Sequence, residues 1–201
     1  MYRNFVKRMI DLIVSIIIFP FFLILYIIIG IMIKIEDRGN ILYKANRIGK
    51  DGKIFKMYKF RSMKMNSPNI LNKDGSTYNS KNDPRVTKIG KFIRETSIDE
   101  IPQIINVIKG DMSLIGPRAS LEETLNTYQE DEKDKMKVRP GITGYTQAYF
   151  RNSLSVRDKR LKDAWYANHV SFKLDIKIFF KTIITIFKKE NIYTNDGNNK
   201  S

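Results

Sequence analysis

The longest apolar stretch of the chain lies close to its N-terminus. Residues 12–33 include no charged side chain, and 22 helical residues at about 1.5 Å each extend about 33 Å, enough to cross the hydrocarbon core of a membrane. Pro20 lies inside this stretch and removes one backbone hydrogen bond, so a break or kink is expected there. The sequence therefore predicts a membrane-embedded helix-break-helix over residues 1–38.

Basic residues flank this apolar segment on both sides. They are Arg3, Lys7 and Arg8 before it, and Lys34, Arg38, Lys44, Arg47 and Lys50 after it. Because Lys and Arg favour the cytoplasmic side of a membrane segment, both ends are expected to face the cytoplasm. A re-entrant helix that enters and leaves by one leaflet satisfies the charges and Pro20 together. A plain, kinked transmembrane helix is the alternative, and both interpretations stay open here.

A second apolar pattern, with helical spacing, occupies residues 172–189. Ile176, Phe179, Ile183 and Phe187 define one stripe, and lysines recur every four residues on another. Such a helix either lies in the headgroup layer of a membrane or packs on the domain core, and the pattern does not separate the two. The polar residues 190–201 after it predict a disordered tail.

Between these segments, shorter patterns predict a mainly α-helical domain over residues 39–189. Residues 41–43 and 54–60 are typical of strands, and Asp51-Gly52 between them indicates a hairpin turn. Helical patterns occur at residues 90–94, 102–109, 121–137 and 156–166. The expected fold class is mainly α with a small β-hairpin or sheet, a re-entrant or kinked N-terminal membrane helix, and amphipathic surface helices.

Composition narrows the range of chemistries. The chain has 201 residues, no cysteine, one histidine and a formal net charge of +15. Thiolate metal sites are thereby excluded, and a zinc hydrolase or a Ser-His-Asp hydrolase is improbable because both depend on a well-placed histidine. The large positive charge indicates an anionic partner: nucleic acid, an anionic membrane leaflet or a phosphorylated substrate.

The strongest candidate for catalysis is the acidic pair Asp99-Glu100, within the sequence SIDEIPQ at residues 97–103. Pro102 is tolerated in the first turn of a helix, which would put both carboxylates at a helix N-terminus, where anions are favoured. A carboxylate can attack phosphorus, and its neighbour can hold the Mg²⁺ that neutralises a diphosphate. The structural alternative is a capping box formed by Ser97 and Glu100.

Candidate phosphate contacts come from basic residues spread through the domain. Strand alternation would turn Lys59 and Arg61 to one face, and further arginines stand near glycine, proline or helical segments. The expected substrate-binding residues are Lys59, Arg61, Arg94, Arg118 and Arg139. Each of them taken alone is also explained as a solvated surface residue or part of a turn.

Taken in order along nearly the whole chain, several motifs resemble those of the bacterial sugar transferase family, the small monotopic phosphoglycosyl transferases. They are KRxxD at 7–11, YKFRSM at 58–63, SIDEIPQ at 97–103, NVIKGDMSLIGPR at 106–118, VRPGITG at 138–144 and LDIKI at 174–178. The ordered set is specific, although each motif alone is weak.

The resemblance implies a function. Family members transfer a sugar 1-phosphate from a UDP-sugar to polyprenyl (undecaprenyl) phosphate, with Mg²⁺, at the cytoplasmic face of the bacterial inner membrane, as the first membrane step of glycan assembly. It implies that Asp99 is a nucleophile forming a covalent phosphosugar intermediate and that Glu100 holds the metal. Lys59, Arg94 and Arg118 correspond to basic contacts of the family. The chain would then be the minimal catalytic unit.

Two other functional classes remain as alternatives. A membrane-tethered nucleic-acid binder agrees with the charge, but the chain contains no recognition-helix pattern or base-stacking motif, so no nucleic-acid partner is expected. A non-catalytic membrane scaffold is disfavoured by the intact Asp99-Glu100 pair. The expected partners are a UDP-sugar, polyprenyl phosphate and an anionic leaflet, with a homo-oligomer left open.

Overall fold

The computed structural model describes residues 1–68, 70, 72, 78, 80 and 82–188. The predicted polar tail, residues 190–201, lies outside the described residues.

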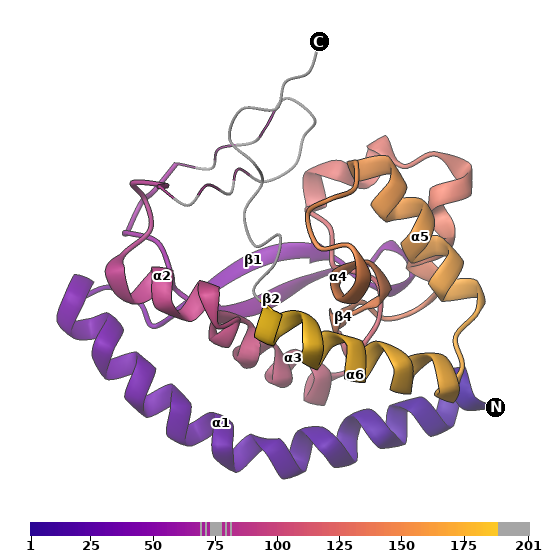
Figure 1. Cartoon of the computed structure of the whole chain (residues 1–201), viewed down its shortest axis with the longest axis horizontal. Coiled ribbons are helices and arrows are strands. Elements are labelled where there is room, and N and C mark those ends of the chain that lie inside the picture. The colour runs from indigo at the N-terminus through magenta and orange to yellow at the C-terminus, as the bar shows by residue number, and fades with distance from the viewer. Residues whose placement is uncertain (69, 71, 73–77, 79, 81, 189–201) are drawn as a thin grey trace.

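The N-terminal apolar stretch forms one long helix. A short π-helical turn, η1 (Tyr2–Val6), leads into α1 (Lys7–Asp37), which is about 46 Å long at the usual rise per residue. The predicted break at Pro20 is not formed, because a proline removes only its own N–H while the hydrogen bonds on either side of it persist. Figure 1 shows α1 as a bowed helix that passes along one side of the molecule. The bend agrees with the kinked form of the prediction.

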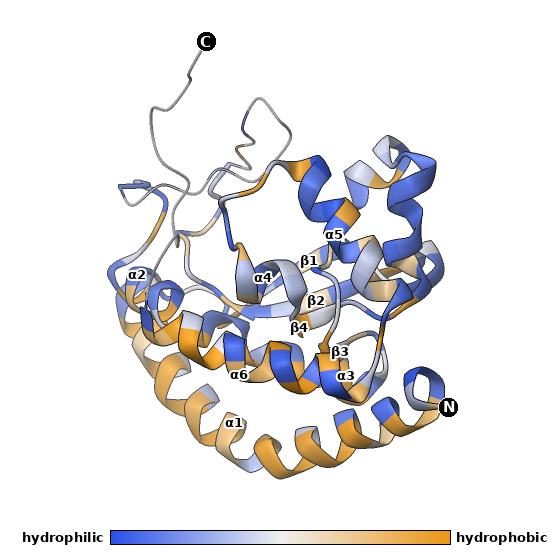
Figure 2. Cartoon of the chain, turned by 45° about the vertical axis from the view of Figure 1, so that its right-hand side comes forward, coloured by the Kyte–Doolittle hydropathy of each residue, from blue (hydrophilic) through white to orange (hydrophobic). Residues whose placement is uncertain are grey.

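Helix α1 has a face that packs on the domain and a face that does not. Phe22, Ile29 and Ile33 are buried and form a cluster with Phe60 and Ile93 of the domain. Most of the other apolar side chains of the helix are exposed. Figure 2 shows the apolar colour running along α1 and alternating with hydrophilic colour along α6, whereas α5, away from α1, is largely hydrophilic.

The predicted hairpin is confirmed and its first strand is longer than expected. Strands β1 (Leu42–Ile48) and β2 (Ile54–Phe60) pair antiparallel, with Leu42 opposite Phe60 and Ile48 opposite Ile54. The single turn η2 (Lys50–Gly52) joins them, and Asp51 and Gly52 there both have positive φ, as an Asp-Gly turn requires.

Four of the predicted helical segments are also confirmed. They are α2 (Lys88–Glu95), the 3-10 helix η3 (Ile98–Gln103) continuing into α3 (Ile104–Lys109), α5 (Val156–Asn168) and α6 (Phe172–Lys188). The helix expected over residues 121–137 is wrong. This segment forms two 3-10 helices, η4 (Glu122–Thr127) and η5 (Glu130–Lys137), because Tyr128 and Gln129 between them are extended.

A second, parallel pair of strands was not anticipated. Strands β3 (Ser113–Ile115) and β4 (Gly141–Thr143) pair with Ser113 opposite Gly141, and the short helix α4 (Tyr145–Tyr149) follows. Gly116 and Gly144 lie so close together that a Cβ on Gly144 would collide with the Gly116 carbonyl oxygen. This close approach fixes the start of the loop that carries Arg118. The fold is thus mainly α-helical with two small sheets, as the sequence predicts.

Candidate active site

The Asp99-Glu100 pair lies on the 3-10 turn η3, immediately before α3 begins at Ile104. Ser97, which precedes the turn, has the left-handed conformation with φ of 58°, and its side chain makes no capping hydrogen bond. The capping-box interpretation of Ser97 and Glu100 is therefore wrong. Both side chains are largely buried, with exposed fractions of 13% for Asp99 and 22% for Glu100.

Lys59 of β2 provides the nearest cation for both carboxylates. Its Nζ donates to Glu100 Oε1 at 2.6 Å and lies 4.0 Å from Asp99 Oδ2. A second cation approaches from the loop after β3, where Arg118 Nη1 is 3.8 Å from the same Glu100 oxygen. Residues 41 and 18 positions apart from Glu100 in the sequence thus meet at one carboxylate.

The two carboxyl groups respond differently to these surroundings. Burial raises the pKa of Asp99 to about 6, against the opposing attraction of Lys59 and with a further rise caused by the charge of Glu100. Burial also raises the pKa of Glu100, but Lys59 and Arg118 outweigh it, so the pKa of Glu100 lies below its ordinary value. Glu100 consequently stays ionised, and Asp99 is mostly ionised at neutral pH. Burial, rather than the weak dipole of one 3-10 turn, is the main cause of the raised pKa of Asp99.

The five predicted phosphate contacts do not all converge. Lys59, Arg94 and Arg118 line one cleft with the acidic pair, and the positive charge of Arg94 acts on Asp99. Arg61 also lines this cleft, but it lies just beyond the end of β2, where its guanidinium is already engaged by the Asp37 carboxylate and the Asn40 carbonyl. The expected alternation with Lys59 ends because β2 stops at Phe60.

Arg139 is also away from the acidic pair. Its Nε donates to the Gly110 carbonyl oxygen at 2.8 Å, close to the Arg8 side chain of α1. It is not part of the cleft lining. In this structure Arg61 and Arg139 serve contacts within the fold.

Arg118 is held in place through its backbone. Its N–H donates to Asp163 Oδ2 at 3.3 Å, and its carbonyl oxygen accepts from Lys135 Nζ at 3.1 Å. Lys135 and Asp163 themselves form a buried ion pair at 3.2 Å. Asp163 also accepts a hydrogen bond from the Thr146 hydroxyl at 2.8 Å. The two members of one buried ion pair therefore hold the backbone N–H and the carbonyl oxygen of Arg118.

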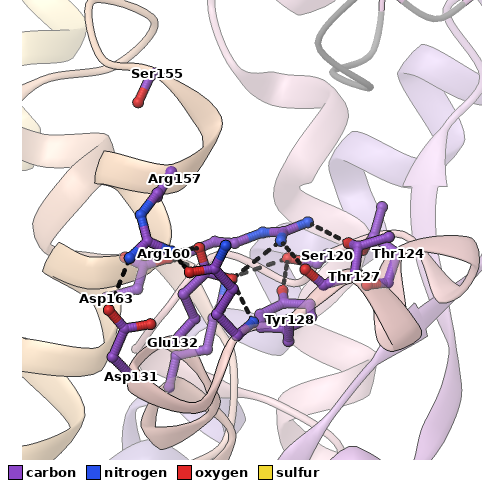
Figure 3. Close-up of polar contacts among 12 residues, drawn as sticks. Ser120, Thr124, Thr127, Tyr128, Asp131, Glu132, Ser155, Arg157, Arg160 and Asp163 are labelled. Carbon is purple, nitrogen blue, oxygen red and sulfur yellow. Dashed lines mark hydrogen bonds and ion pairs between the residues drawn. The ribbon is translucent and has the colours of Figure 1, made fainter.

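A neighbouring cluster fastens η5 to α5. Figure 3 shows Arg157 and Arg160 of α5 converging on Glu132, whose two carboxylate oxygens each lie 3.2 Å from one of these arginines. Arg160 also stacks over the Tyr128 ring at 4.2 Å. Residues 121–137 form two 3-10 helices instead of one regular helix, and in this arrangement the Glu132 side chain binds the arginines of α5.

The motif residues near the N-terminus dock α1 on the domain. Asp175 of α6 is buried and accepts hydrogen bonds at 2.6 Å from Tyr2, Lys7 and Tyr166. Arg8 donates to the carbonyl oxygens at the end of α3, and Asp11 accepts from the Leu114 N–H at 3.1 Å. This set of contacts therefore determines the position of the apolar helix relative to the acidic pair.

The cleft that holds the acidic pair has a volume of about 2310 Å³ and two kinds of wall. Near Asp99 it is lined by cationic side chains. Further along, its wall is made of apolar side chains from α1 and α6, among them Ile10, Val14, Phe179 and Ile183. An anionic group and a hydrocarbon chain can thus occupy neighbouring parts of one cleft.

Arg47, Lys135 and Asp163 are site residues that the sequence interpretation missed. Arg47 was counted only with the basic residues that follow the apolar segment, although the hairpin register places it on the strand face that carries Lys59. The Asp-Gly turn fixes that register, so the signal for Arg47 was present. Lys135 and Asp163 carry no such signal, because their pairing depends on how η5 meets α5.

Comparison with known proteins places the chain among proteins of related sequence. Residues 2–189 match the family described as bacterial sugar transferase. The chain is 37% identical over 209 residues to an undecaprenyl-phosphate galactose phosphotransferase of Salmonella typhimurium. It is 39% identical over 188 residues to a UDP-N-acetylgalactosamine-undecaprenyl-phosphate N-acetylgalactosaminephosphotransferase of Aeromonas hydrophila.

These relatives differ in length from the chain. The two matches cover 94% and 90% of the chain but 42% and 44% of the relatives, so the chain spans about two fifths of their length. An exopolysaccharide production protein of Sinorhizobium fredii is 33% identical over 198 residues, which are 93% of this chain and 88% of that relative.

Proposed function

The chain belongs to the bacterial sugar transferase family, and from this premise we propose that it is a phosphoglycosyl transferase. It transfers a sugar 1-phosphate from a UDP-sugar to polyprenyl (undecaprenyl) phosphate and releases UMP, an initiating membrane step of polysaccharide assembly. Two relatives are named for sugar phosphate transfer to undecaprenyl phosphate, one with galactose and one with N-acetylgalactosamine.

One observation carries this proposal: the buried acidic pair stands in a cationic cleft whose walls continue into the apolar sides of α1 and α6. Lys59, Arg94 and Arg118 can attract the diphosphate of a nucleotide sugar to Asp99. The apolar wall suits the hydrocarbon chain of the acceptor. Both substrates of the reaction are therefore matched by the chemistry of one cleft.

In the proposed mechanism Asp99 acts as the nucleophile. An oxygen of its carboxylate attacks the phosphorus that bears the sugar, the bond from this phosphorus to the bridging oxygen breaks, and UMP leaves with that oxygen. The sugar phosphate is then held on Asp99 as an acyl phosphate. A phosphate oxygen of the polyprenyl phosphate attacks the same phosphorus, and the Asp99 carboxylate departs, which yields polyprenyl-diphosphate-sugar.

The basic residues have separate parts in these steps. Lys59 and Arg118 lie near enough to Glu100 to offset the negative charge that gathers when a diphosphate enters. Arg94, whose charge already acts on Asp99, favours the ionised nucleophile. Asp99 is the less tightly paired of the two carboxylates, so its oxygen is more available for attack.

The acidic pair also fits a magnesium ion shared with substrate. Mg²⁺ is commonly bound through one or two carboxylates with substrate phosphates and water completing its shell. Within the described part of the chain no group of three or more acidic or imidazole side chains could hold a metal alone. Glu100, with Asp99 beside it, would hold the ion, which when bound neutralises charge on the diphosphate.

This metal proposal is tested with Glu100→Gln. The substitution keeps the size of the side chain and removes its anion, so we expect most turnover to be lost and Mn²⁺ binding in the presence of UDP to weaken, measured by electron paramagnetic resonance. Normal turnover with an unchanged Mg²⁺ requirement would contradict the role of Glu100.

The proposed location is the cytoplasmic face of the bacterial inner membrane. Within the described residues, Tyr2–Asp37 is the one helix that is long and apolar enough to cross a membrane by length and composition. The exposed apolar side chains of α1 and of α6, including Phe179, Phe180 and Ile184, lie on neighbouring surfaces that a leaflet would cover.

The function is tested by incubating the purified protein with undecaprenyl phosphate, Mg²⁺ and a panel of UDP-sugars. We expect UMP release and a lipid-linked sugar diphosphate with at least one donor. The matched control is Asp99→Asn, which should release no UMP. The proposal would be contradicted if no UDP-sugar in the panel led to UMP release while an active relative, assayed in parallel as a positive control, did release UMP.

A further inference from the structure

Arg47 lies near the end of β1, on the same sheet face as Lys59. Cross-strand partners in an antiparallel pair share a face, and Tyr43 is the partner of Lys59. Arg47 follows Tyr43 by four residues on β1, and strand residues an even number apart share a face. The hairpin therefore presents two cations, Lys59 and Arg47, on the side of the sheet that lines the cleft.

The end of β1 also lies against the loop that carries Arg118. Arg47 forms an isolated bridge with Leu121, and the N–H of Ile48 donates to the Ser120 carbonyl oxygen at 3.0 Å. Both Arg47 and Arg118 line the cleft. The loop and the strand thus bring two guanidinium groups to one place from positions 71 residues apart.

Arg47 carries an unused buried donor. Its Nε is buried and makes no hydrogen bond within the part of the chain that the structure describes. Glu100 and Glu123 are close enough to attract the guanidinium, yet neither accepts from this Nε. Since a buried N–H without an acceptor costs free energy, this geometry favours an incoming acceptor.

The charge around Arg47 points to the same acceptor. Burial, and then the positive charge of Arg118, lower the pKa of Arg47, although a guanidinium remains protonated at neutral pH. Two like charges held near each other in a partly buried place repel. An oxyanion between them removes the repulsion and provides the missing acceptor.

We infer that Arg47 and Arg118 form the two sides of a site for a phosphate oxyanion of substrate, with Arg47 donating through its Nε. This inference rests on the proposed function, which supplies two phosphate-bearing substrates. The oxyanion belongs either to the diphosphate of the UDP-sugar or to the phosphate of the polyprenyl acceptor. No bond is made or broken at Arg47, which acts as a binding residue.

The test measures binding rather than turnover. Isothermal titration calorimetry of the full chain in nanodiscs gives the Kd for UDP and, separately, for undecaprenyl phosphate. Arg47→Met removes both the charge and the Nε donor, so the Kd of the probe whose phosphate it contacts should rise about 10- to 100-fold. Arg47→Lys keeps the charge but loses the planar fork, and a smaller rise is expected.

Lys50→Gln is the matched control. Lys50 stands three residues after Arg47, lies outside the cleft lining, and its loss removes the same unit of charge from the protein. Its Kd values should equal those of the wild type. The thermal unfolding midpoint of each variant separates lost binding from lost folding, and Arg47→Lys, which also lacks a nitrogen at the ε position, retains a test if Arg47→Met does not fold.

Each outcome gives a decision. Weaker binding of UDP alone assigns the oxyanion to the nucleotide, and weaker binding of undecaprenyl phosphate alone assigns it to the acceptor. Unchanged Kd values for both probes in folded Arg47 variants overturn the inference and leave the proposed function intact. A wild-type protein that binds neither probe overturns both.

Discussion

Asp99 and Glu100 are adjacent in the sequence, but their carboxyl groups have different partners. Glu100 accepts a hydrogen bond from Lys59 at 2.6 Å, whereas Asp99 is 4.0 Å from the same nitrogen. The pKa of Glu100 is lowered and that of Asp99 is raised to about 6. At the scale of single residues, this difference separates a carboxylate whose pKa lies below its ordinary value from one whose pKa is raised to about 6.

The first prediction concerns Asp99 as a nucleophile. Wild-type protein given UDP-sugar without lipid acceptor should release about one UMP per active site and retain the sugar phosphate on Asp99. Asp99→Asn should abolish this burst, because the amide lacks the nucleophilic oxygen at nearly the same size. Rapid-quench measurement of UMP and mass spectrometry of the protein test both points. Loading of the variant would show that Asp99 is not the nucleophile.

The second prediction follows from the raised pKa of Asp99. A carboxyl whose pKa rises on folding holds its proton more tightly in the folded state, so its ionisation destabilises the fold as pH increases through about 6. The Asp99→Asn side chain cannot ionise, so at pH 8 the variant should be more stable than wild type by up to about 3 kcal/mol in free energy of unfolding. It should therefore also unfold at a higher temperature. The gap should shrink toward pH 4.

Thermal unfolding at several pH values in one detergent checks this expectation. Asp131→Asn is a suitable control, since Asp131 is half-exposed on the surface and should show no pH-dependent gap of this size. If Asp99→Asn differed in stability from wild type by the same amount at pH 4 and pH 8, the raised pKa of buried Asp99 would not be the cause of the difference.

At the scale of elements, the Arg118 loop depends on how η5 packs against α5. The third prediction is that Asp163→Asn destabilises the protein by about 3–5 kcal/mol, because it leaves the buried Lys135 charge without its partner. It should also raise the KM for the UDP-sugar in the fraction that folds, since Arg118 loses an anchor for its N–H.

The exposed pair of Asp131 and Arg157 offers a matched comparison. Asp131→Asn also removes one carboxylate from the interface of η5 and α5, but at the surface, and should cost about 1 kcal/mol or less with no change in KM. Chemical denaturation and steady-state kinetics measure the two effects. Equal behaviour of the two variants would show that Asp163 does not position Arg118.

Helix α1 is fastened to the same domain at both ends. Lys7 pairs with Asp175 at 2.6 Å near its start, and Asp37 pairs with Arg61 at its end. Glu36 also accepts from the N–H of Lys88 at 2.6 Å. A continuous helix that returns to one domain at both termini is hard to reconcile with one end on each side of a bilayer.

The fourth prediction is therefore a re-entrant topology. Single cysteines placed at Asn4 and Asn40 in this cysteine-free chain should both react with a membrane-impermeant maleimide only in inside-out vesicles. Permeabilised cells serve as the control for reactivity at each position. Reaction of one position from each side of the membrane would establish a spanning helix instead.

At the scale of the whole molecule, charge and apolar surface are separated. The apolar faces of α1 and α6 lie together, and the hydrophilic surface of α5 lies away from them. The whole chain has a net charge of +15, and Lys59, Arg94 and Arg118 are among the residues that line the cleft. This separation agrees with the proposed membrane location and with the proposed phosphate-bearing substrates.

The fifth prediction concerns this field. Raising the ionic strength from about 0.05 M to 0.5 M shortens the screening length to a few ångströms, so kcat/KM for the UDP-sugar should fall several-fold while kcat at saturation changes little. Steady-state kinetics at constant free Mg²⁺ measures both constants. A fall in kcat alone would point to an effect of salt on the fold or the membrane.

Local patterns in the sequence were sufficient for the elements that depend on neighbouring residues. The apolar segment, the amphipathic helix α6 and the Asp51-Gly52 hairpin follow from hydrophobic periodicity and turn chemistry, which act over a few residues. The acidic pair was found from its motif. Strands β3 and β4, at three residues each, are too short for any periodicity to appear.

The tertiary structure decided which charged residues meet. Lys59 reaches Glu100 across 41 positions, Lys135 reaches Asp163 across 28, and Arg61 pairs with Asp37 rather than with the acidic pair. Identical residue types with similar local sequence can end in the cleft or in the framework, because ion pairing depends on distance in space and on burial, neither of which is encoded in spacing along the chain. The sequence by itself determined the acidic pair and the elements with a clear local pattern, whereas packing between distant elements determined strands β3 and β4, the two 3-10 helices η4 and η5, and the cationic partners of the acidic pair.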